Sequence, residues 1–223
     1  MSDRLDPTLT ISGTFERVSS DLVRAAAGLP TATLHEAAGK IGVMPPTIKP
    51  VARGMKIAGP AITVQAPGGD NLWLHRAIYA AQPGDVLVVS VSGAYDHGYW
   101  GEIMSTACQV RGLAGLVIDG CVRDGELLNT IGFPVFARGL CIRGTGKDFG
   151  ARGWVGYPTM FDDLVVNSGD LVVGDGDGVV VIPRARAGEV IEASNLREVA
   201  EAKQIERLQA GESTLKLFNF DQP

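Results

Sequence analysis

The sequence has few cysteines and no long apolar run. Among its 223 residues only three are cysteines, Cys108, Cys121 and Cys141, and each stands among apolar neighbours. An odd number of cysteines in such surroundings argues against a disulfide framework and predicts reduced, core-packed thiols in a cytoplasmic protein. No apolar run approaches the roughly 18 residues of a membrane helix, and no basic segment precedes an apolar one at the N-terminus. We therefore expect neither a membrane span nor a signal peptide.

The chain also lacks a net positive charge. Its formal net charge is −5 and its isoelectric point is about 5.2. General binding to nucleic acid requires a positive surface that replaces counterions, so this composition argues against nucleic acid as a partner. If the substrate is an anion, local arginines and backbone amides have to hold it against the overall field.

Several common site motifs are absent. The three histidines have no Cys or His at ligand spacing, which argues against a structural zinc site. No Gly-x-Ser-x-Gly elbow is present. The segment GTGKDFG (144–150) has the wrong spacing for a dinucleotide fingerprint. GDGDG (174–178) begins like a calcium loop but lacks the glutamate at the twelfth position, so we interpret it as a hairpin turn.

What the sequence does have is a high apolar content in short alternating elements. Hydrophobic residues make up 45% of the chain and charged residues 20%, which is typical of a globular protein, and we expect 1–223 to form one domain. The first part of the chain alternates between helix and strand, as in β-α-β-α folds. Helices are predicted at 19–28, 31–40, 71–81, 101–112 and 124–132, and strands at 60–66, 83–93, 114–119 and 134–137.

The pattern changes after Ile142. Residues 162–183 contain three short β runs separated by turns, which predicts a meander or the edge of a barrel. One long charged helix follows, and we treat 184–211 as an arm and 1–18 as an N-terminal extension. A thin apolar stripe favours an arm lying across another subunit over a helix buried in its own core. The stripe consists of Val190, Leu196, Val199, Ile205 and Leu208.

The stretch GLVIDGCVRDGE (115–126) places a cation beside a carboxylate just past a predicted buried strand. Neighbouring side chains of an extended segment point to opposite faces, which argues against an ion pair between Arg123 and Asp124. We prefer the hypothesis that both act on a shared third group, such as a metal ion with an anionic ligand.

A second informative stretch, YWGEIMS, lies at the start of a predicted helix. Gly101 allows a ligand to approach closely, and the free amides of Ile103 and Met104 would form a carboxylate site. The competing interpretation is that Gly101 only caps the helix and that Glu102 only favours its dipole.

Twenty residues separate Glu102 from Arg123. That spacing fits a helix, a turn and a strand that return the chain to the same edge. Glu102, Asp124 and the helix amides would then surround one pocket at the carboxyl ends of the strands, where open α/β sheets usually bind ligands.

These residues resemble a known family. WGEIMSTACQVRGLAGLVIDGCVRD is similar to the divalent-metal-dependent class II pyruvate aldolases that cleave 4-hydroxy-4-methyl-2-oxoglutarate and 4-carboxy-4-hydroxy-2-oxoadipate. The regulators of ribonuclease activity type A share their fold. The signature is an acidic residue, twenty residues and Arg-Asp, which stands here as Glu102 and Arg123-Asp124. The resemblance covers nearly the whole chain after about residue 20. It includes TATLHEAAGKIGVMPPTIKPV (31–51), GDNLWLH (69–75), PGDVLVV, GDGDGVVVIP and REVAEAKQIERLQAG (197–211).

The resemblance implies roles for the matching residues. Asp124 is expected to bind Mg²⁺ or Mn²⁺, and Arg123 to stabilise the C2 oxygen of pyruvate. The amides of Ile103 and Met104, which follow Gly101, are expected to bind the pyruvate carboxylate.

Further roles follow from the same resemblance. Glu102, and Glu201 from the C-terminal helix of a neighbouring subunit, are expected to order waters at the metal and to support removal of the substrate's hydroxyl proton. Lys147 stands where these aldolases carry lysine, and Asn71 is a further candidate for substrate contact.

Some residues have no assigned role. These are His35, Glu36 and His75, and for them, as for Asn71, helix packing and capping are the competing explanation. The aldolases also carry aspartate where this chain has Glu102. The extra methylene could be absorbed in a water-mediated contact, and it leaves another reaction of the same family open.

The chemistry of the residues agrees with the resemblance. Cleavage of a carbon–carbon bond next to a 2-oxo acid generates an enolate. A hard cation and an arginine both stabilise the negative charge that develops on its oxygen. Carboxylates and water suit such a cation, and no soft ligand is needed.

We expect a mixed α/β fold, a swivelling-type β/β/α sandwich with flanking helices and a long C-terminal helical arm, assembled as a trimer or hexamer. The expected function is Mg²⁺- or Mn²⁺-dependent release of pyruvate from a 4-hydroxy-2-oxo acid, with oxaloacetate decarboxylation as a side activity. Two alternatives stay open. One is a non-catalytic binding protein of the ribonuclease-regulator type, which we expect to lack the arm. The other is a lyase or hydratase acting on a sugar-acid-like substrate.

Overall fold

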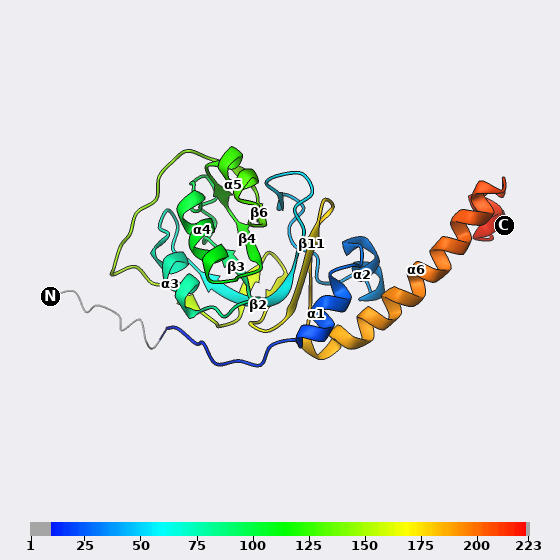
Figure 1. Ribbon diagram of the computed structural model, residues 1–223, viewed down its shortest axis with the longest axis horizontal. Coiled ribbons are helices and arrows are strands. Elements are labelled where there is room, and N and C mark those ends of the chain that lie inside the picture. The colour runs from blue at the N-terminus through cyan, green and yellow to red at the C-terminus, as the bar shows by residue number, and fades with distance from the viewer. Residues whose placement is uncertain (1–9, 222–223) are drawn as a thin grey trace.

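A computed structural model describes residues 10–221 and has a mixed eight-stranded sheet at its centre (Figure 1). The four inner strands β2, β3, β4 and β6 run parallel to one another; β1, β8 and β11 pair antiparallel with them, and β12 pairs antiparallel with β11. In spatial order the strands are β1 (Lys49–Pro50), β6 (Val135–Ala137), β4 (Gly115–Asp119), β3 (Val86–Ser90), β2 (Ile57–Gln65), β11 (Leu171–Asp175) and β12 (Gly178–Ile182), with β8 (Trp154–Val155) also paired to β2.

Apolar side chains fill both faces of the sheet. Every residue of β3 and β4 is buried, as expected for parallel strands that are covered on both sides. One face packs on the crossover helices α3 (Leu72–Ala80), α4 (Glu102–Val110) and α5 (Gly125–Ile131). The other face packs on the hairpin of β9 (Thr159–Phe161) and β10 (Leu164–Val166) and on the chain that precedes β2. The alternation predicted from the sequence is therefore confirmed in this region.

A second group of helices packs beside the hairpin of β11 and β12. It consists of α1 (Ser20–Ala26), α2 (Thr31–Ala37) and the first part of α6 (Ala187–Gln209). Ser19 caps α1 as the sequence predicted, because its hydroxyl accepts the amide proton of Leu22.

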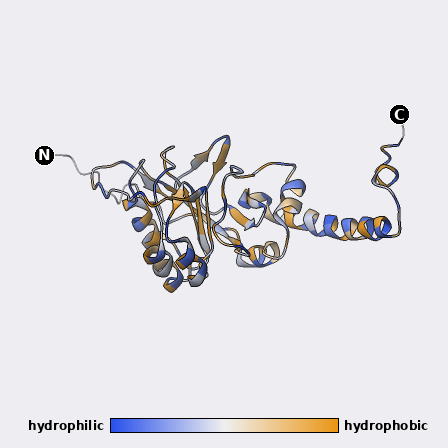
Figure 2. Cartoon of the chain, turned by 90° about the horizontal axis from the view of Figure 1, so that it is seen from above, coloured by the Kyte–Doolittle hydropathy of each residue, from blue (hydrophilic) through white to orange (hydrophobic). Residues whose placement is uncertain are grey.

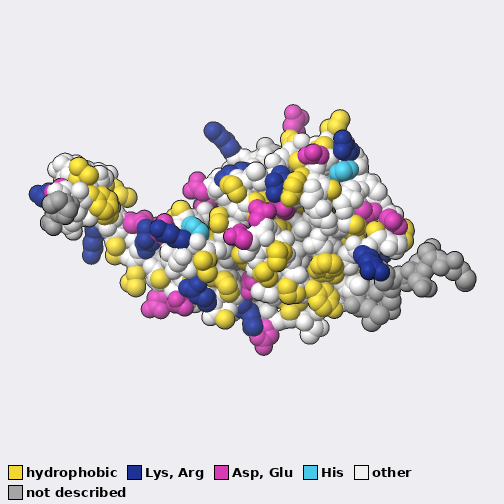
Figure 3. Space-filling view, turned by 180° about the vertical axis from the view of Figure 1, so that it is seen from behind, with side chains coloured by type: hydrophobic (Ala, Val, Ile, Leu, Met, Phe, Trp, Pro, Cys, Tyr) yellow, Lys and Arg dark blue, Asp and Glu magenta, His cyan; other side chains and the backbone are white. Residues whose placement is uncertain are grey.

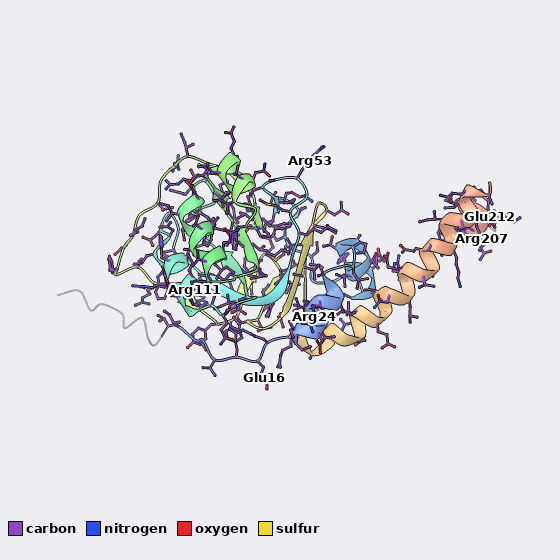
Figure 4. The ribbon with its side chains drawn as sticks, in the orientation of Figure 1. Glu16, Arg24, Arg53, Arg111, Arg207 and Glu212 are labelled. Atoms are coloured by element: carbon purple, nitrogen blue, oxygen red, sulfur yellow. The ribbon has the colours of Figure 1, made fainter. Side chains whose placement is uncertain are left out.

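The remainder of α6 leaves the body and projects away from it (Figures 1 and 2). Val190 is buried among α1 and α2, whereas Leu196, Val199 and Ile205 are 69%, 58% and 53% exposed. At the tip a short helix, α7 (Thr214–Leu217), folds back, and Arg207 pairs with Glu212 at 2.6 Å (Figure 4). Apolar side chains gather on this tip (Figure 3). The stripe identified in the sequence is thus largely uncovered within the chain.

Some details differ from the sequence expectations. Strand β2 begins at Ile57, earlier than predicted, and β10 pairs with β9 instead of continuing a meander. Residues 184–186 form a 3₁₀ turn that precedes α6. Cys108 is buried, but Cys121 and Cys141 are only partly buried: Cys121 lies in β5 (Cys121–Val122), and Cys141 follows β7 (Gly139–Leu140), with which β5 forms a small two-stranded sheet.

The proposed N-terminal extension is only partly described, since residues 1–9 lie outside the described residues. Its described part runs along the body, where Arg17 makes an ion pair of 2.7 Å with the fully buried Asp85. Among the described helices, none is both long enough and apolar enough to cross a membrane.

Candidate functional site

A cavity of about 310 Å³ lies beside the start of α4. Four segments line it, and they are far apart in the sequence. The segments are the start of α3 with Asn71 and His75, residues 98–104, the pair Arg123 and Asp124, and residues 144–147. The cavity therefore contains all the predicted site residues except Glu201.

Hydrogen bonds hold the predicted Gly-Glu and Arg-Asp segments together. The amide of Arg123 donates to the carbonyl of Trp100 at 2.8 Å, and the amide of Tyr99 donates to the carbonyl of Cys121 at 3.1 Å. Trp100 is buried, and its indole nitrogen donates to Ser105 at 2.7 Å. Helix α4, strand β4 and a turn thus return the chain to the same edge, as the twenty-residue spacing predicted.

Arg123 and Asp124 contact each other, contrary to the expectation from an extended segment. Nε of Arg123 lies 3.8 Å from Oδ2 of Asp124. The physical reason is that Asp124 is not extended: its φ of 60° and ψ of 37° are left-handed, and it precedes α5 as the capping residue. The contact is long and both side chains are partly exposed, so the pair contributes little to stability. Both side chains remain available to a third group in the cavity.

Position 101 has no room for a side chain. Its φ of −164° is extended and suits any residue, but a Cβ placed there would lie 2.2 Å from Oδ2 of Asp124. That same oxygen accepts the amide proton of Glu102 at 3.1 Å. Asp124 thus occupies the space that a side chain at position 101 would fill, and it caps the first amide of α4.

The following first-turn amides of α4 lie beside the cavity. No side chain caps α4 from Gly101, and the first-turn amides of Ile103 and Met104 have no partner inside a helix. The side chain of Ile103 is exposed and that of Met104 is buried, so the backbone between them borders the cavity. An anion bound here would meet N–H donors and the positive end of the helix dipole.

The start of α3 forms another wall of the cavity. Asn71 is buried, and its side-chain nitrogen Nδ2 donates to the carbonyl of Tyr99 at 2.9 Å. Its Oδ1 atom is buried and has no hydrogen-bond partner among the described residues. An unsatisfied buried acceptor is costly, and it marks a position where a ligand or water hydroxyl can donate. Helix capping does not account for Asn71, because the capping oxygen for Leu72 comes from Asp70.

His75 follows Asn71 by one helical turn and also lines the cavity. Burial lowers the pKa of His75, the positive charge of Lys147 lowers it further, and Asp70 opposes both effects. His75 is therefore largely neutral near pH 7. The sequence had left packing as the competing explanation for this residue. The i, i+4 spacing from Asn71 was the signal that places both on one helix face.

His35 and Glu36 lie outside the cavity on α2. His35 Nδ1 is 3.1 Å from the carbonyl oxygen of Ile41, and Glu36 lies 3.8 Å from Lys40. Packing and local pairing explain both residues.

Glu201 lies on the projecting part of α6. It makes an ion pair of 2.6 Å with Arg197 and lines a separate groove with Ile205 and Phe218. Glu198, one turn earlier, accepts a hydrogen bond of 2.6 Å from Thr33 of its own chain. Glu201 does not line the cavity of its own chain, so any part in that site requires a second copy.

The donor set of the cavity suits a hydrated hard cation. Among residues 10–221 there is no group of three or more His, Cys, Asp or Glu side chains that could hold a metal. Two carboxylates, Glu102 and Asp124, line the cavity. Mg²⁺ binds proteins through one or two carboxylates, keeps several waters and takes further oxygens from its substrate, so these residues fit it. They suit zinc less well, because zinc sites take three or four protein ligands that are mostly His nitrogen and Cys sulfur.

Comparison with known proteins identifies the family. The family model "RraA-like: Aldolase/RraA" matches residues 30–181. The chain belongs to the RraA-like family. A Halalkalibacterium halodurans protein with the provisional name 4-hydroxy-4-methyl-2-oxoglutarate aldolase is 33% identical over 178 residues, which cover 80% of this chain and 84% of that protein.

Solved structures of the RraA-like type share the fold. A crystal structure of an uncharacterized Pseudomonas syringae protein matches with a TM-score of 0.80 and 30% identity, covering 93% of this chain and 97% of that one. Streptomyces coelicolor RraAS2, described as an unusual member of the RNase ES inhibitor RraA family, matches with a TM-score of 0.75 and 29% identity. The match covers 86% of this chain and all of RraAS2 (100%). The RraA-like family thus includes proteins named as aldolases and proteins named as nuclease inhibitors.

Proposed function

We propose that this chain is a divalent-metal-dependent lyase that cleaves a 4-hydroxy-2-oxo acid by a retro-aldol reaction and releases pyruvate. The observation that carries the proposal is the convergence of Arg123, Asp124 and the open start of α4 on one cavity. Gly101 adds to this, because its missing side chain leaves the space that Asp124 occupies. Decarboxylation of oxaloacetate passes through the same enolate, so we expect it as a side activity.

Asp124 would hold Mg²⁺ or Mn²⁺ directly, with Glu102 and a second copy's Glu201 acting through water. When bound, the cation supplies positive charge that stabilises an enolate oxygen. Arg123 donates hydrogen bonds to the C2 oxygen of the substrate, where the negative charge develops. The amides of Ile103 and Met104 bind the C1 carboxylate.

The other half of the substrate lies toward α3. There Oδ1 of Asn71 is a buried acceptor without a partner among the described residues, and a water between it and the substrate would satisfy it. Lys147 offers a positive charge at the same end of the cavity.

The proposed reaction has two proton transfers. Water oriented by Glu102 and Glu201 accepts the proton of the 4-hydroxyl, the C4–O bond becomes a carbonyl, and the C3–C4 bond breaks. Its electron pair moves into the enolate beside Arg123. Protonation at C3 then gives pyruvate.

The assembly is part of the proposal. We propose that 1–223 is a single domain of the swivelling β/β/α type that forms a trimer or hexamer through its arm, 184–211. The exposed apolar side chains of α6 support a second copy as the partner. The chain would then act in the cytoplasm on a small 2-oxo acid.

The test is a panel of 2-oxo acids incubated with the protein and Mg²⁺ or Mn²⁺, with pyruvate release as the readout. We expect at least one 4-hydroxy-2-oxo acid to be cleaved. Because one carboxylate holds the ion directly, EDTA should abolish the activity and added metal should restore it. Full activity after exhaustive chelation, or no cleavage of any member of the panel, would contradict the proposal.

A non-catalytic, nuclease-regulating role is the second candidate. It is favoured by the similarity to RraAS2. In that case the panel would show no turnover, and Arg123→Ala would leave the function intact. A lyase or hydratase on a sugar-acid-like substrate is the remaining alternative, since Glu102 is longer than the aspartate of the aldolases. Turnover of sugar acids without pyruvate release would identify it.

A further inference from the structure

The side chain of Arg123 has little that holds its charged end. Among residues 10–221 its guanidinium makes no hydrogen bond, and its one ion-pair contact, with Oδ2 of Asp124, is 3.8 Å long. The side chain is 50% exposed, so an unrestrained guanidinium would sample several rotamers. The function proposed above requires one orientation, because a donor stabilises a developing oxyanion best from a fixed position. Packing of the aliphatic stem has to supply that orientation.

The stem of Arg123 lies against two glycines, Gly98 and Gly101. A Cβ at position 98 would stand 3.1 Å from Cβ and 3.2 Å from Cδ of Arg123, and one at position 101 would stand 3.3 Å from its Cγ. The segment that carries the glycines runs alongside Arg123, whose amide donates to the carbonyl of Trp100 at 2.8 Å. The two missing side chains thus leave a slot along the aliphatic part of Arg123.

Gly98 also lies close to the backbone of residues 141–143. Its amide donates to the carbonyl of Arg143 at 2.8 Å, and a Cβ on it would stand 2.4 Å from the carbonyl oxygen of Cys141. The backbone of Gly98 is not left-handed, so it is the lack of room, and not the conformation, that requires glycine. A methyl group at position 98 should displace Arg123 more than Cys141, because a partly exposed side chain rotates more easily than a hydrogen-bonded backbone shifts.

Resting on the function proposed above, we propose that Gly98 is a positioning residue that orients Arg123 toward the C2 oxygen of the substrate. Gly101 has a different part, because the atom nearest to a Cβ there would be Oδ2 of Asp124, at 2.2 Å. The space at position 98 therefore sets the arginine, and the space at position 101 sets the carboxylate proposed to bind the metal. Changes at the two glycines should affect different steps: turnover for Gly98, and metal affinity for Gly101.

Gly98→Ala tests the slot, and Gly59→Ala is its matched control. A Cβ at position 59, in β2 and outside the cavity lining, would also stand 2.4 Å from a carbonyl oxygen, that of Gly84. The readout is pyruvate release, with Mg²⁺, from the best-cleaved 4-hydroxy-2-oxo acid of the panel. Only Gly98→Ala should lose turnover per folded molecule, by about tenfold to 100-fold. The loss should fall on kcat, with KM and the Mg²⁺ dependence little changed, because Arg123 acts on charge that develops in the transition state.

The same change in an Arg123→Lys chain separates positioning from general damage. If Gly98 acts through the planar fork, Gly98→Ala should lower kcat by about twofold or less once that fork is absent, a clear departure from additivity. Equal fold losses in the two chains would overturn the proposal, and so would unchanged turnover of Gly98→Ala. A Gly98→Ala chain that does not fold would also overturn it, because the glycine would then serve the fold. If the unmodified protein releases no pyruvate from any member of the panel, the proposed function itself fails.

Discussion

The sheet-centred body and the projecting part of α6 differ in where their apolar side chains lie. In the body, Val88 and Ile118 are fully buried between helices and a hairpin. In the arm, Leu196 and Val199 are more than half exposed. The body therefore encloses its own core, whereas the projecting part of α6 leaves much of its apolar stripe exposed. We infer that the cavity is built by the body and completed by the arm of a second copy.

The largest effect is expected for Arg123→Lys, within the body. Lysine keeps the charge but lacks the planar fork that positions two donors. Turnover should fall by about 100-fold or more. The thermal midpoint should barely move, because the Arg123–Asp124 contact is long and partly exposed. Steady-state kinetics measure the expected loss of turnover, and thermal unfolding measures the expected constancy of the thermal midpoint. A large loss of stability with activity per folded molecule preserved would make the pair structural.

Gly101→Ala tests the space that Asp124 occupies. The new Cβ would fall 2.2 Å from Oδ2 of Asp124, so the carboxylate has to move. We expect activity to drop by about tenfold or more and the apparent metal affinity to weaken, since the directly bound carboxylate is displaced. Gly176→Ala is the matched control, because nothing lies within 4 Å of a Cβ there. Equal kinetics for the two variants would show that Asp124 does not need its present position.

A pair of truncations compares the packing of the two regions. Ile118→Ala should destabilise the fold by about 2–5 kcal/mol, because it empties part of a closed core. Leu196→Ala should change the stability of an isolated chain by only about 0.5 kcal/mol or less, since its side chain is exposed. Chemical unfolding measures both. If the arm packs on a second copy, the effect of Leu196→Ala should appear instead in oligomer dissociation at low protein concentration.

The sequence predicted most of the body because its local signals agree with one another. The buried strands are continuous apolar runs, and Ser19 caps α1 as its position indicated. The twenty-residue spacing also correctly predicted that Glu102 and Arg123 line one cavity.

What the sequence could not predict depends on tertiary contacts. The backbone of Asp124 is left-handed before α5, and its carboxylate lies against Gly101; residue order alone indicates neither. Burial lowers the pKa of His75, and Lys147 lowers it further; Lys147 is distant in sequence and comes from the 144–148 loop, which is hydrogen-bonded to the start of α3. The partner proposed for the arm is a second copy of the chain. One sequence and one chain therefore indicate which apolar face of α6 is exposed, but they do not indicate which residues that face contacts.

The most direct measurement mixes two inactive variants. Arg123→Ala removes the body's contribution and Glu201→Ala removes the arm's, so each should be nearly inactive alone. Glu198→Ala should stay active, because Glu198 is bonded to Thr33 of its own chain. Unfolded together at equal ratio and refolded, the two inactive chains should recover about a quarter of the unmodified pyruvate release. That fraction follows because each site draws its body and its arm from different copies in a symmetric assembly. Mixed oligomers that form but stay inactive would contradict a site shared between two copies.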